Sequence, residues 1–208
     1  MPESTAGWAF ADVFAVEDEA ILAARHASEQ FGITAVSPGA GAALAVAAAS
    51  RPVQSIVEIG TGVGVSGLWL LRGAPAAQLT TIDVDVDHHQ VARPLFAAAG
   101  HPAKQVRLIT GRAADVLPRM NEASYDLVFV DAGWESVAEH TESALGLVRP
   151  GGSVLVAHVL QGGKVANPVK RDQVTTTYRD LLKTLRARED LLAGLNPVGD
   201  GLLHVVRR

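Results

Sequence analysis

The sequence predicts an α/β protein built on one doubly wound, mostly parallel sheet of seven strands, and three observations lead to this class. Short apolar runs alternate with helical patterns from residue 51 onward, as in parallel sheets that are covered by helices on both faces. A turn with alternating glycines follows the first of these runs. Near the end, two apolar runs flank a turn rich in Pro and Gly, which predicts a C-terminal antiparallel hairpin.

The N-terminal part is predicted to be helical. Apolar residues at helical spacing predict an amphipathic helix over 12–31, which Gly32 ends. After an extended link, Ser37 as the N-cap and Pro38 at the first helical position start a second helix over 38–49. The apolar faces of these extra N-terminal helices offer a surface for a homodimer.

The remaining elements follow in regular alternation. The predicted strands are 55–59, 78–83, 107–110, 127–131, 153–158, 191–196 and 202–206. The predicted helices between them are 66–72, 87–99, 114–120, 137–148 and 171–187. Residues 149–152 and 161–168 are expected to be a turn and a loop.

The bulk properties restrict the classes of partner. With 208 residues the chain has one sizeable core, so we expect a single domain over 1–208, with a helical cap over 1–50 and the core over 51–208. The net charge of −4 and scattered basic residues predict no nucleic-acid partner. Cysteine is absent, which excludes disulfides and thiolate sites and fits a cytoplasmic protein. We see no secretory signal in residues 1–5 and no run long enough for a membrane span.

The turn after the first strand carries Gly60, Gly62 and Gly64. Glycine permits positive φ and, without a Cβ atom, lets a ligand lie against the main chain. The helix that follows directs free N–H groups at such a ligand. Asp83 ends the second strand 23 residues after Gly60, where a carboxylate can accept both hydroxyl groups of a ribose. The turn and Asp83 therefore predict a ligand with an adenosine-like part.

Two cofactors fit this pattern. The glycines at 62, 64 and 67 also satisfy the spacing G-x-G-x-x-G, so an NAD(P)-binding oxidoreductase stays open as an alternative. Glu58 just before the turn, the C-terminal hairpin and the absence of a Tyr-x-x-x-Lys pair favour a different cofactor.

Further motifs extend over nearly the whole chain in a fixed order. They are the segments 57–62, 81–83, 111–117, 125–132, 149–152, 162–165 and 197–201. In this set the sequence resembles the class I S-adenosylmethionine-dependent O-methyltransferases of the catechol and caffeoyl-CoA type, including an actinobacterial branch of predicted O-methyltransferases. The resemblance implies a Rossmann-like fold, S-adenosylmethionine as cofactor, and methyl transfer to a hydroxyl oxygen of a small acceptor, with phenols as the first class to consider.

The resemblance also implies roles for single residues, carried over by position. It implies that Glu58, Gly60, Thr61 and Ser66 surround the methionine part of the cofactor, with Val36 above them. It implies that Asp83 and Val84 hold the ribose and that Ala113 lies beside the adenine. It also implies that Asp131 and Gly133 lie at the junction with the acceptor.

The sequence departs from the family at its metal site. The family pattern has an Asp after strand four, an Asp-Asn pair at the end of strand five, and a Lys three residues after the first Asp. Here the pair is Ala157-His158 and Trp134 stands at the Lys position. Because magnesium prefers several oxygen ligands, a divalent metal is doubtful and we assign no metal ligands. A softer metal on Asp131 and His158 stays open.

Methyl transfer from a sulfonium is a direct displacement, so alignment supplies much of the catalysis. A hydroxyl nucleophile still benefits from losing its proton. We expect His158 to be the general base, because an imidazole changes charge near neutral pH, with Asp131, Lys164 and His140 as further candidates.

Other interpretations stand beside this one. A strand-end histidine is often structural, so a non-catalytic S-adenosylmethionine-binding protein is the second hypothesis. His88 and His89 lie next to each other at a predicted helix start, and we expect both to be solvated.

Overall fold

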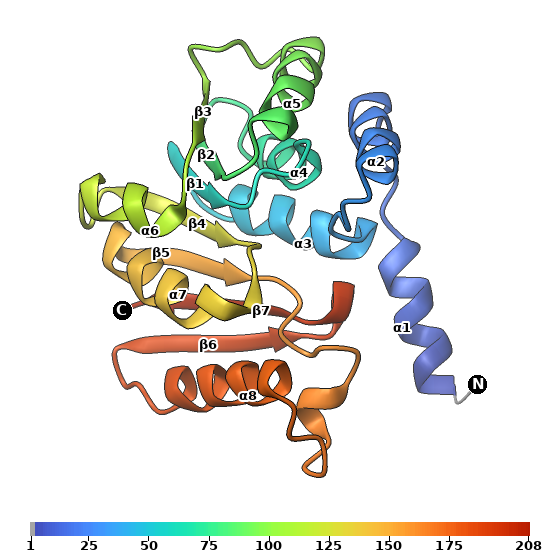
Figure 1. Cartoon of the computed structure of the whole chain (residues 1–208), viewed down its shortest axis with the longest axis vertical. Helices are drawn as coiled ribbons and strands as arrows, with labels where there is room; N and C mark the ends of the chain where they lie inside the picture. Colours follow the sequence, from blue (N-terminus) through green and yellow to red (C-terminus); the bar gives the residue numbers. More distant parts are fainter. Residues whose placement is uncertain (1–2) are drawn as a thin grey trace.

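The computed structural model describes residues 3–208 and has a central seven-stranded sheet with helices on both faces (Figure 1). Residues 1 and 2, which are part of the 1–5 segment in which no secretory signal is predicted, lie outside the described part. The strands are β1 (Ser55–Ile59), β2 (Gln78–Asp83), β3 (Val106–Thr110), β4 (Tyr125–Val130), β5 (Val148–Val156), β6 (Leu191–Asn196) and β7 (Leu202–Arg207).

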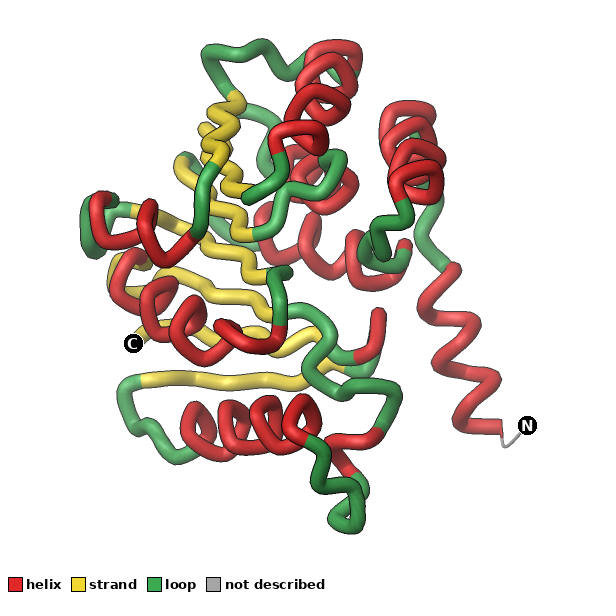
Figure 2. The backbone as a smooth tube through the Cα atoms, in the orientation of Figure 1, coloured by secondary structure: helices red, strands yellow, loops and turns green. Residues whose placement is uncertain are grey.

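The strand order is β3-β2-β1-β4-β5-β7-β6. The first five strands pair in parallel, whereas β7 pairs antiparallel with both β5 and β6. Figure 2 shows the strands as one continuous ladder between the helices. The predicted fold class, including the C-terminal antiparallel strands, is confirmed.

The α-helices are α1 (Glu3–Val13), α2 (Glu19–Phe31), α3 (Pro38–Ala49), α4 (Val65–Gly73), α5 (Val86–Ala98), α6 (Ala113–Val116), α7 (Val137–Leu147) and α8 (Gln173–Arg186). Short 3-10 helices are η1 (Leu117–Arg119), η2 (Trp134–Ser136), η3 (Lys164–Ala166) and η4 (Val198–Asp200). Within residues 3–208, no helix combines the length and the apolar character that crossing a membrane requires.

Successive strand residues point to opposite faces of the sheet, and their side chains pack into a buried core on each face. Ile56 and Phe129 belong to the core that contains Leu44 of α3 and Trp69 of α4. Their sequence neighbours Val57 and Val128 point to the other core, which contains side chains of α7 and α8. This period of two, with both faces covered, explains why the strands read as continuous apolar runs.

The single helix predicted over 12–31 is wrong, because the structure has two helices with a break at 14–18. Asp18 is the N-cap of α2 and accepts a hydrogen bond from the Ile21 N–H. Glu17 in the break forms an ion pair with Arg25. A side-chain cap and a partly buried ion pair thus replace helical continuity. The helix α1, which begins at Glu3, was not predicted as a separate element.

The start of α3 follows the prediction and also anchors α1. Ser37 accepts from the Ala40 N–H at 3.2 Å, as an N-cap does. The Ser37 hydroxyl also donates to Asp12 of α1, whose Oδ1 atom accepts a further hydrogen bond from the Gly199 N–H of η4 at 3.1 Å. Asp12 therefore connects the first helix to the turn between β6 and β7.

Strand five differs from its predicted range. It begins at Val148 and ends at Val156, and its pairing with β4 shifts register between Tyr125 and Leu127. The turn predicted at 149–152 is therefore the irregular start of this strand. His158 follows the strand with a left-handed φ of 58°, so the strand cannot continue to it as predicted.

Candidate active site

A cleft lies at the carboxyl ends of the central strands, where the strand order reverses between β1 and β4. It has two compartments with volumes of about 310 and 150 Å³. Gly60, Asp83 and Asp131 line both compartments, so these residues stand at the junction between them.

The glycine turn adopts the conformation that its sequence predicts. Gly60, Gly62 and Gly64 have φ values of 97°, 48° and 100°, a region that side chains with a Cβ atom rarely occupy. Gly64 is the N-cap of α4. The Gly62 N–H donates to Asp83 Oδ2 at 2.9 Å, so the turn is fixed to the end of β2.

Asp83 is held in one orientation by the main chain. Besides the bond from Gly62, its Oδ1 atom accepts from the Asp85 N–H at 3.0 Å. His88 Nδ1 lies 3.3 Å from the same Oδ1 atom. His88 was expected to be solvated, but it is partly buried and lines the smaller compartment. A carboxylate oriented in this way is ready to accept hydrogen bonds from a ligand.

Glu58 lies beneath the cleft and lines neither compartment. Its side chain is fully buried, and the hydroxyls of Ser66 and Thr81 each donate to it at 2.6 Å. Burial raises the pKa of Glu58 to about 7, against the effect of these two hydrogen bonds. A positive charge on a bound ligand would therefore favour the ionised form of Glu58.

The other predicted cofactor residues line the cleft. Val84, Ala113 and Gly133 line the larger compartment, and Val36, Thr61 and Ser66 line the smaller one. The Thr61 hydroxyl faces inward, since its Oγ1 atom lies 2.6 Å from Thr81 Oγ1. Only the main chain of Thr61 is thus free to meet a ligand. The structure brings the predicted set together, while its binding role stays a prediction.

The end of the cleft where the acceptor is expected, here called the acceptor end, contains Asp131. His158 lies beside Asp131 but lines neither compartment. His158 Nε2 lies 3.6 Å from Asp131 Oδ1. Burial raises the pKa of Asp131, and the nearby His158 opposes that effect. The left-handed backbone of His158 costs of the order of 1 kcal/mol or more, and such strain is concentrated at functional sites.

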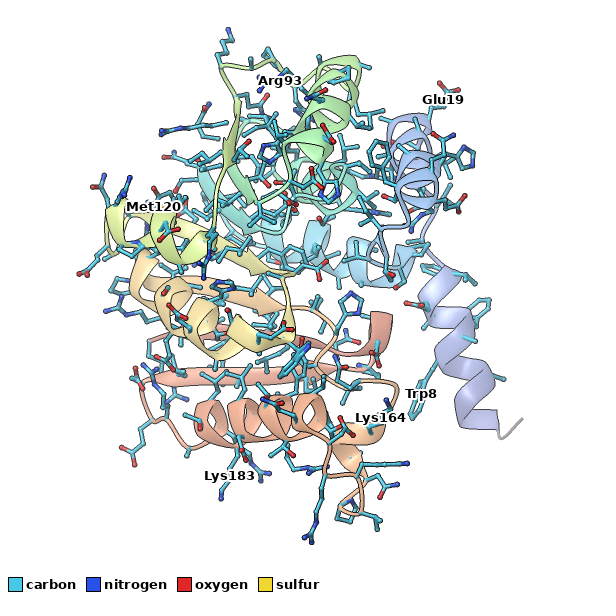
Figure 3. All side chains as sticks on the ribbon, in the orientation of Figure 1. Trp8, Glu19, Arg93, Met120, Lys164 and Lys183 are labelled. Carbon is cyan, nitrogen blue, oxygen red and sulfur yellow. The ribbon has the colours of Figure 1, made fainter. Side chains whose placement is uncertain are left out.

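Two further catalytic candidates occupy different places. His140 lines the larger compartment, and burial lowers the pKa of its imidazole. Lys164 is exposed on η3 beside α8, and it lines neither compartment (Figure 3). The structure therefore does not bring Lys164 to Asp131 and His158.

Tyr178 of α8 is a buried residue near this end that sequence reasoning missed. Burial raises the pKa of its hydroxyl to about 12, and the charges of Asp131, Asp200 and Glu135 add to the effect. The hydroxyl thus lies within the influence of the acceptor-end carboxylates. Its helical spacing with Leu181 and Leu185 is typical of a core residue, so the sequence contained no separate signal for it.

The donor set does not fit a hard divalent cation. Asp131 and His158 supply one carboxylate and one imidazole, and the buried methyl group of Ala157 stands where the family places a second carboxylate. Across residues 3–208, no three His, Asp or Glu side chains converge as a metal site would require. Magnesium needs more oxygen ligands than this site offers.

Comparisons with known proteins agree with this architecture. The sequence model of the O-methyltransferase family matches residues 17–208. A Mycobacterium tuberculosis protein named as a probable O-methyltransferase is 39% identical over 201 residues, covering 96% of this chain and 90% of that protein. TomG, an O-methyltransferase of Streptomyces achromogenes solved in complex with S-adenosylmethionine, has a TM-score of 0.85 at 33% identity, covering 100% of this chain and 99% of that one.

A Bacillus cereus O-methyltransferase solved in complex with S-adenosylhomocysteine also has a TM-score of 0.85, at 25% identity and with full coverage of both chains (100% each). The family match extends from the break before α2 to the end of β7 and so includes every residue of the cleft described above. The chain therefore belongs to the O-methyltransferase family.

Proposed function

We propose that the chain transfers a methyl group from S-adenosylmethionine to a hydroxyl oxygen of a small molecule. Family membership supports this reaction over the NAD(P)-dependent oxidoreductase that the glycine spacing left open. The observation that carries the proposal is the position of Asp131, which lines both compartments of the cleft and lies 3.6 Å from His158. Cofactor and acceptor thus meet at one carboxylate.

The cleft fits the cofactor by charge and shape. When bound, S-adenosylmethionine supplies an electrophilic methyl group on a sulfonium. Asp83, oriented by two main-chain N–H groups, would accept the ribose hydroxyls, with Val84 beside it. The methionine part would lie over Gly60, Thr61 and Ser66 in the smaller compartment.

Three residues complete the proposed cofactor site. Val36 would cover the methionine part, since it lines the smaller compartment. Ala113 would lie beside the adenine, and Gly133 would line the wall toward the acceptor in the larger compartment. Glu58 would act from below as the buried negative charge that faces the cation.

His158 is the proposed general base. It would take the proton of the acceptor hydroxyl, and Asp131 at 3.6 Å would stabilise the imidazolium that forms. Because the donor set does not fit magnesium, alignment and this proton transfer are the contributions that the chain itself makes. Proton transfer to a positioned side chain is worth roughly 10²–10⁴-fold in rate.

The acceptor is proposed to be small and aromatic. The adenine and ribose would occupy the Ala113 and Asp83 side of the larger compartment, so only the space near Gly133 and Asp131 would be left for the acceptor. Trp134 is partly buried on η2 and packs against the core next to this compartment, and a phenol can stack on an indole.

We further propose that the chain works in the cytoplasm as a single domain and forms a homodimer. Ile21 and Leu44 share one buried core with Ile56 of β1, which supports a helical cap over 1–50 joined to the core over 51–208. The large exposed apolar side chains of α1 and of the segment after it, such as Phe10 and Phe14, support the homodimer. The absence of cysteine supports a reducing compartment.

The test is calorimetric titration with S-adenosylhomocysteine, followed by incubation with labelled S-adenosylmethionine and a panel of phenols with and without EDTA. We expect binding heat and label transfer that EDTA does not change. Heat of binding with NAD but none with S-adenosylhomocysteine would contradict the assignment of the cofactor. Methyl transfer that EDTA abolishes would contradict the metal-free mechanism. Binding without transfer across the whole panel would favour a non-catalytic binding protein.

A further inference from the structure

A chain of buried hydrogen bonds runs beneath the glycine turn. In order, its members are Ser66, Glu58, Thr81, Thr61, His89 and Thr110. Thr61 Oγ1 lies 2.6 Å from Thr81 Oγ1 and 3.0 Å from His89 Nε2, and His89 Nδ1 lies 2.9 Å from Thr110 Oγ1. The chain thus joins the ends of β1, β2 and β3 to α5.

The protons in this chain can be assigned by elimination. A threonine hydroxyl has one proton to donate. Thr81 uses its proton on the Glu58 carboxylate, so it accepts from Thr61. Thr61 has then used its own proton and must accept from His89. With Glu58 ionised, His89 is therefore protonated on Nε2, and its Nδ1 atom accepts from Thr110.

The burial of His89 disfavours the charged imidazole. The residue is 4% exposed and was expected to be solvated, which the structure contradicts. Burial is the largest effect and lowers the pKa of His89. The charged or titratable groups that act on its pKa are Asp83 at the end of β2 and Asp85 after it, which raise it, and Arg93 and His88 on α5, which lower it.

His89 lines neither compartment of the cleft. Its hydrogen bond to Thr61 connects it to the cleft, because the main chain of Thr61 lies between Gly60 and Gly62 and lines the smaller compartment. Gly62 in turn donates to Asp83. Holding the Thr61 hydroxyl from below therefore holds the turn on which the methionine part of the cofactor would lie.

We propose that His89 is a positioning residue of the cofactor site, which donates from Nε2 to Thr61 as the neutral tautomer and so fixes the direction of the hydrogen-bond chain toward Glu58. This inference rests on the proposed cofactor site. It assigns to the first turn of α5 a task that is separate from ligand contact.

The first measurement is the tautomer of His89 in the wild-type chain by ¹⁵N NMR of the imidazole, with S-adenosylhomocysteine bound and the resonance identified by its loss in His89→Gln. We expect a protonated Nε2 and an unprotonated Nδ1 between about pH 8 and about pH 9, above the pKa of Glu58, where its side chain is an ionised acceptor. A protonated Nδ1, or a charged ring, in this range would overturn the inference.

The second measurement compares variants by S-adenosylhomocysteine affinity. His89→Leu removes the donor and should weaken binding about tenfold, whereas His89→Gln keeps an N–H donor near the position of Nε2 and should restore most of it. The matched control is His204→Leu on β7, since His204 Nε2 makes a comparable 3.0 Å bond to Ser153 Oγ away from the cleft. The control should bind like the wild type.

The outcomes separate the two proposals. A wild-type chain that does not bind S-adenosylhomocysteine would overturn the cofactor site and this inference with it. If the wild type binds, equal affinity of wild type and His89→Leu would overturn the role of His89 alone. Equal weakening in His89→Leu, His89→Gln and His204→Leu would also overturn it, because that result indicates a general loss of packing.

Discussion

An ideal Cβ atom on Gly60 would lie 1.9 Å from the carbonyl oxygen of Asp131, so the turn after β1 and the end of β4 touch through main chain alone. This contact brings the proposed cofactor site next to the acceptor end, because Gly60 of the turn and Asp131 each line both compartments.

The first prediction concerns this contact. Gly60→Ala should lower the free energy of unfolding by about 3 kcal/mol and abolish most S-adenosylhomocysteine binding, because the methyl group collides with main chain at a φ of 97°. Gly100→Ala is the matched control: its φ is 86°, but no atom lies within 4 Å of the added Cβ. It should cost about 1 kcal/mol. Urea unfolding and calorimetry measure both, and equal costs would show that the close approach is unimportant.

Asp83→Ala should weaken S-adenosylhomocysteine binding by about 2 kcal/mol or more, because ribose hydroxyls and the Gly62 N–H lose a charged acceptor. Asp87→Ala, an exposed carboxylate in the first turn of α5, is the control and should bind normally. Calorimetric titration checks both variants. Normal binding by Asp83→Ala would refute the ribose assignment.

The general base can be identified by comparing two variants. His158→Asn should reduce kcat about 100-fold, since asparagine tolerates the left-handed backbone but takes no proton. Lys164→Ala should keep the wild-type rate, because Lys164 is exposed on η3 and, unlike His158, does not lie beside Asp131. Single-turnover rates with saturating acceptor check this. The reverse ranking would make Lys164 the base and require the loop that carries it to move.

Glu58 predicts a pH dependence of stability. Burial raises its pKa from 4.5 to about 7 in the folded chain, so as the pH rises the unfolded chain releases this proton first. The contribution of Glu58 to the free energy of unfolding is therefore full below about pH 4.5 and falls as the pH rises to about 7, by about 3 kcal/mol at most.

Glutamine cannot ionise, so the free energy of unfolding of Glu58→Gln should lack this pH-dependent contribution. Urea unfolding of both chains at about pH 5 and about pH 8 gives the comparison. The wild type should lose more stability between the two values than the variant does, and an equal loss in both would contradict the burial of an ionisable Glu58.

The homodimer is predicted from the surface of α1 and the segment after it. Phe10 and Phe14 are 68% and 73% exposed with their ring centroids 6.1 Å apart, and large exposed apolar groups mark association sites. Light scattering should give the mass of two chains, and Phe10→Ser combined with Phe14→Ser should give the mass of one. Val169→Ser, which changes an 81% exposed side chain elsewhere, should remain dimeric. A wild-type mass of one chain would contradict the prediction.

Features with a local physical cause could be predicted from the sequence. Glycine at positive φ, the Ser37 cap before Pro38 and a carboxylate at the end of β2 each depend on a few neighbouring residues. The doubly wound, mostly parallel class of the sheet followed as well, because fully apolar strands between helices allow few topologies. Of the residues that line the cleft, Gly60, Gly62 and Asp83 belong to these features, whereas Val36, Ala113 and others were named only through the family resemblance.

Features that depend on distant contacts could not be predicted. His89 is buried because β1, β2 and β3 bring Thr61 and Thr110 to α5, and nothing near His89 in the sequence indicates this. Lys164 was expected near the acceptor, but the course of the loop after β5 puts it beside α8. The break before α2 had a local signal in Asp18, a residue type that favours N-caps, which the apolar periodicity outweighed.

The position of β7 between β5 and β6 has a consequence for synthesis. The ribosome makes β6 before β7, yet β6 pairs only with β7 among the described strands. Until β7 is in place, β6 is a strand without a partner that carries Leu192 and Leu195. This edge of the sheet can therefore be completed only after β7 has docked on β5, and until then the unpaired apolar strand is a site for aggregation.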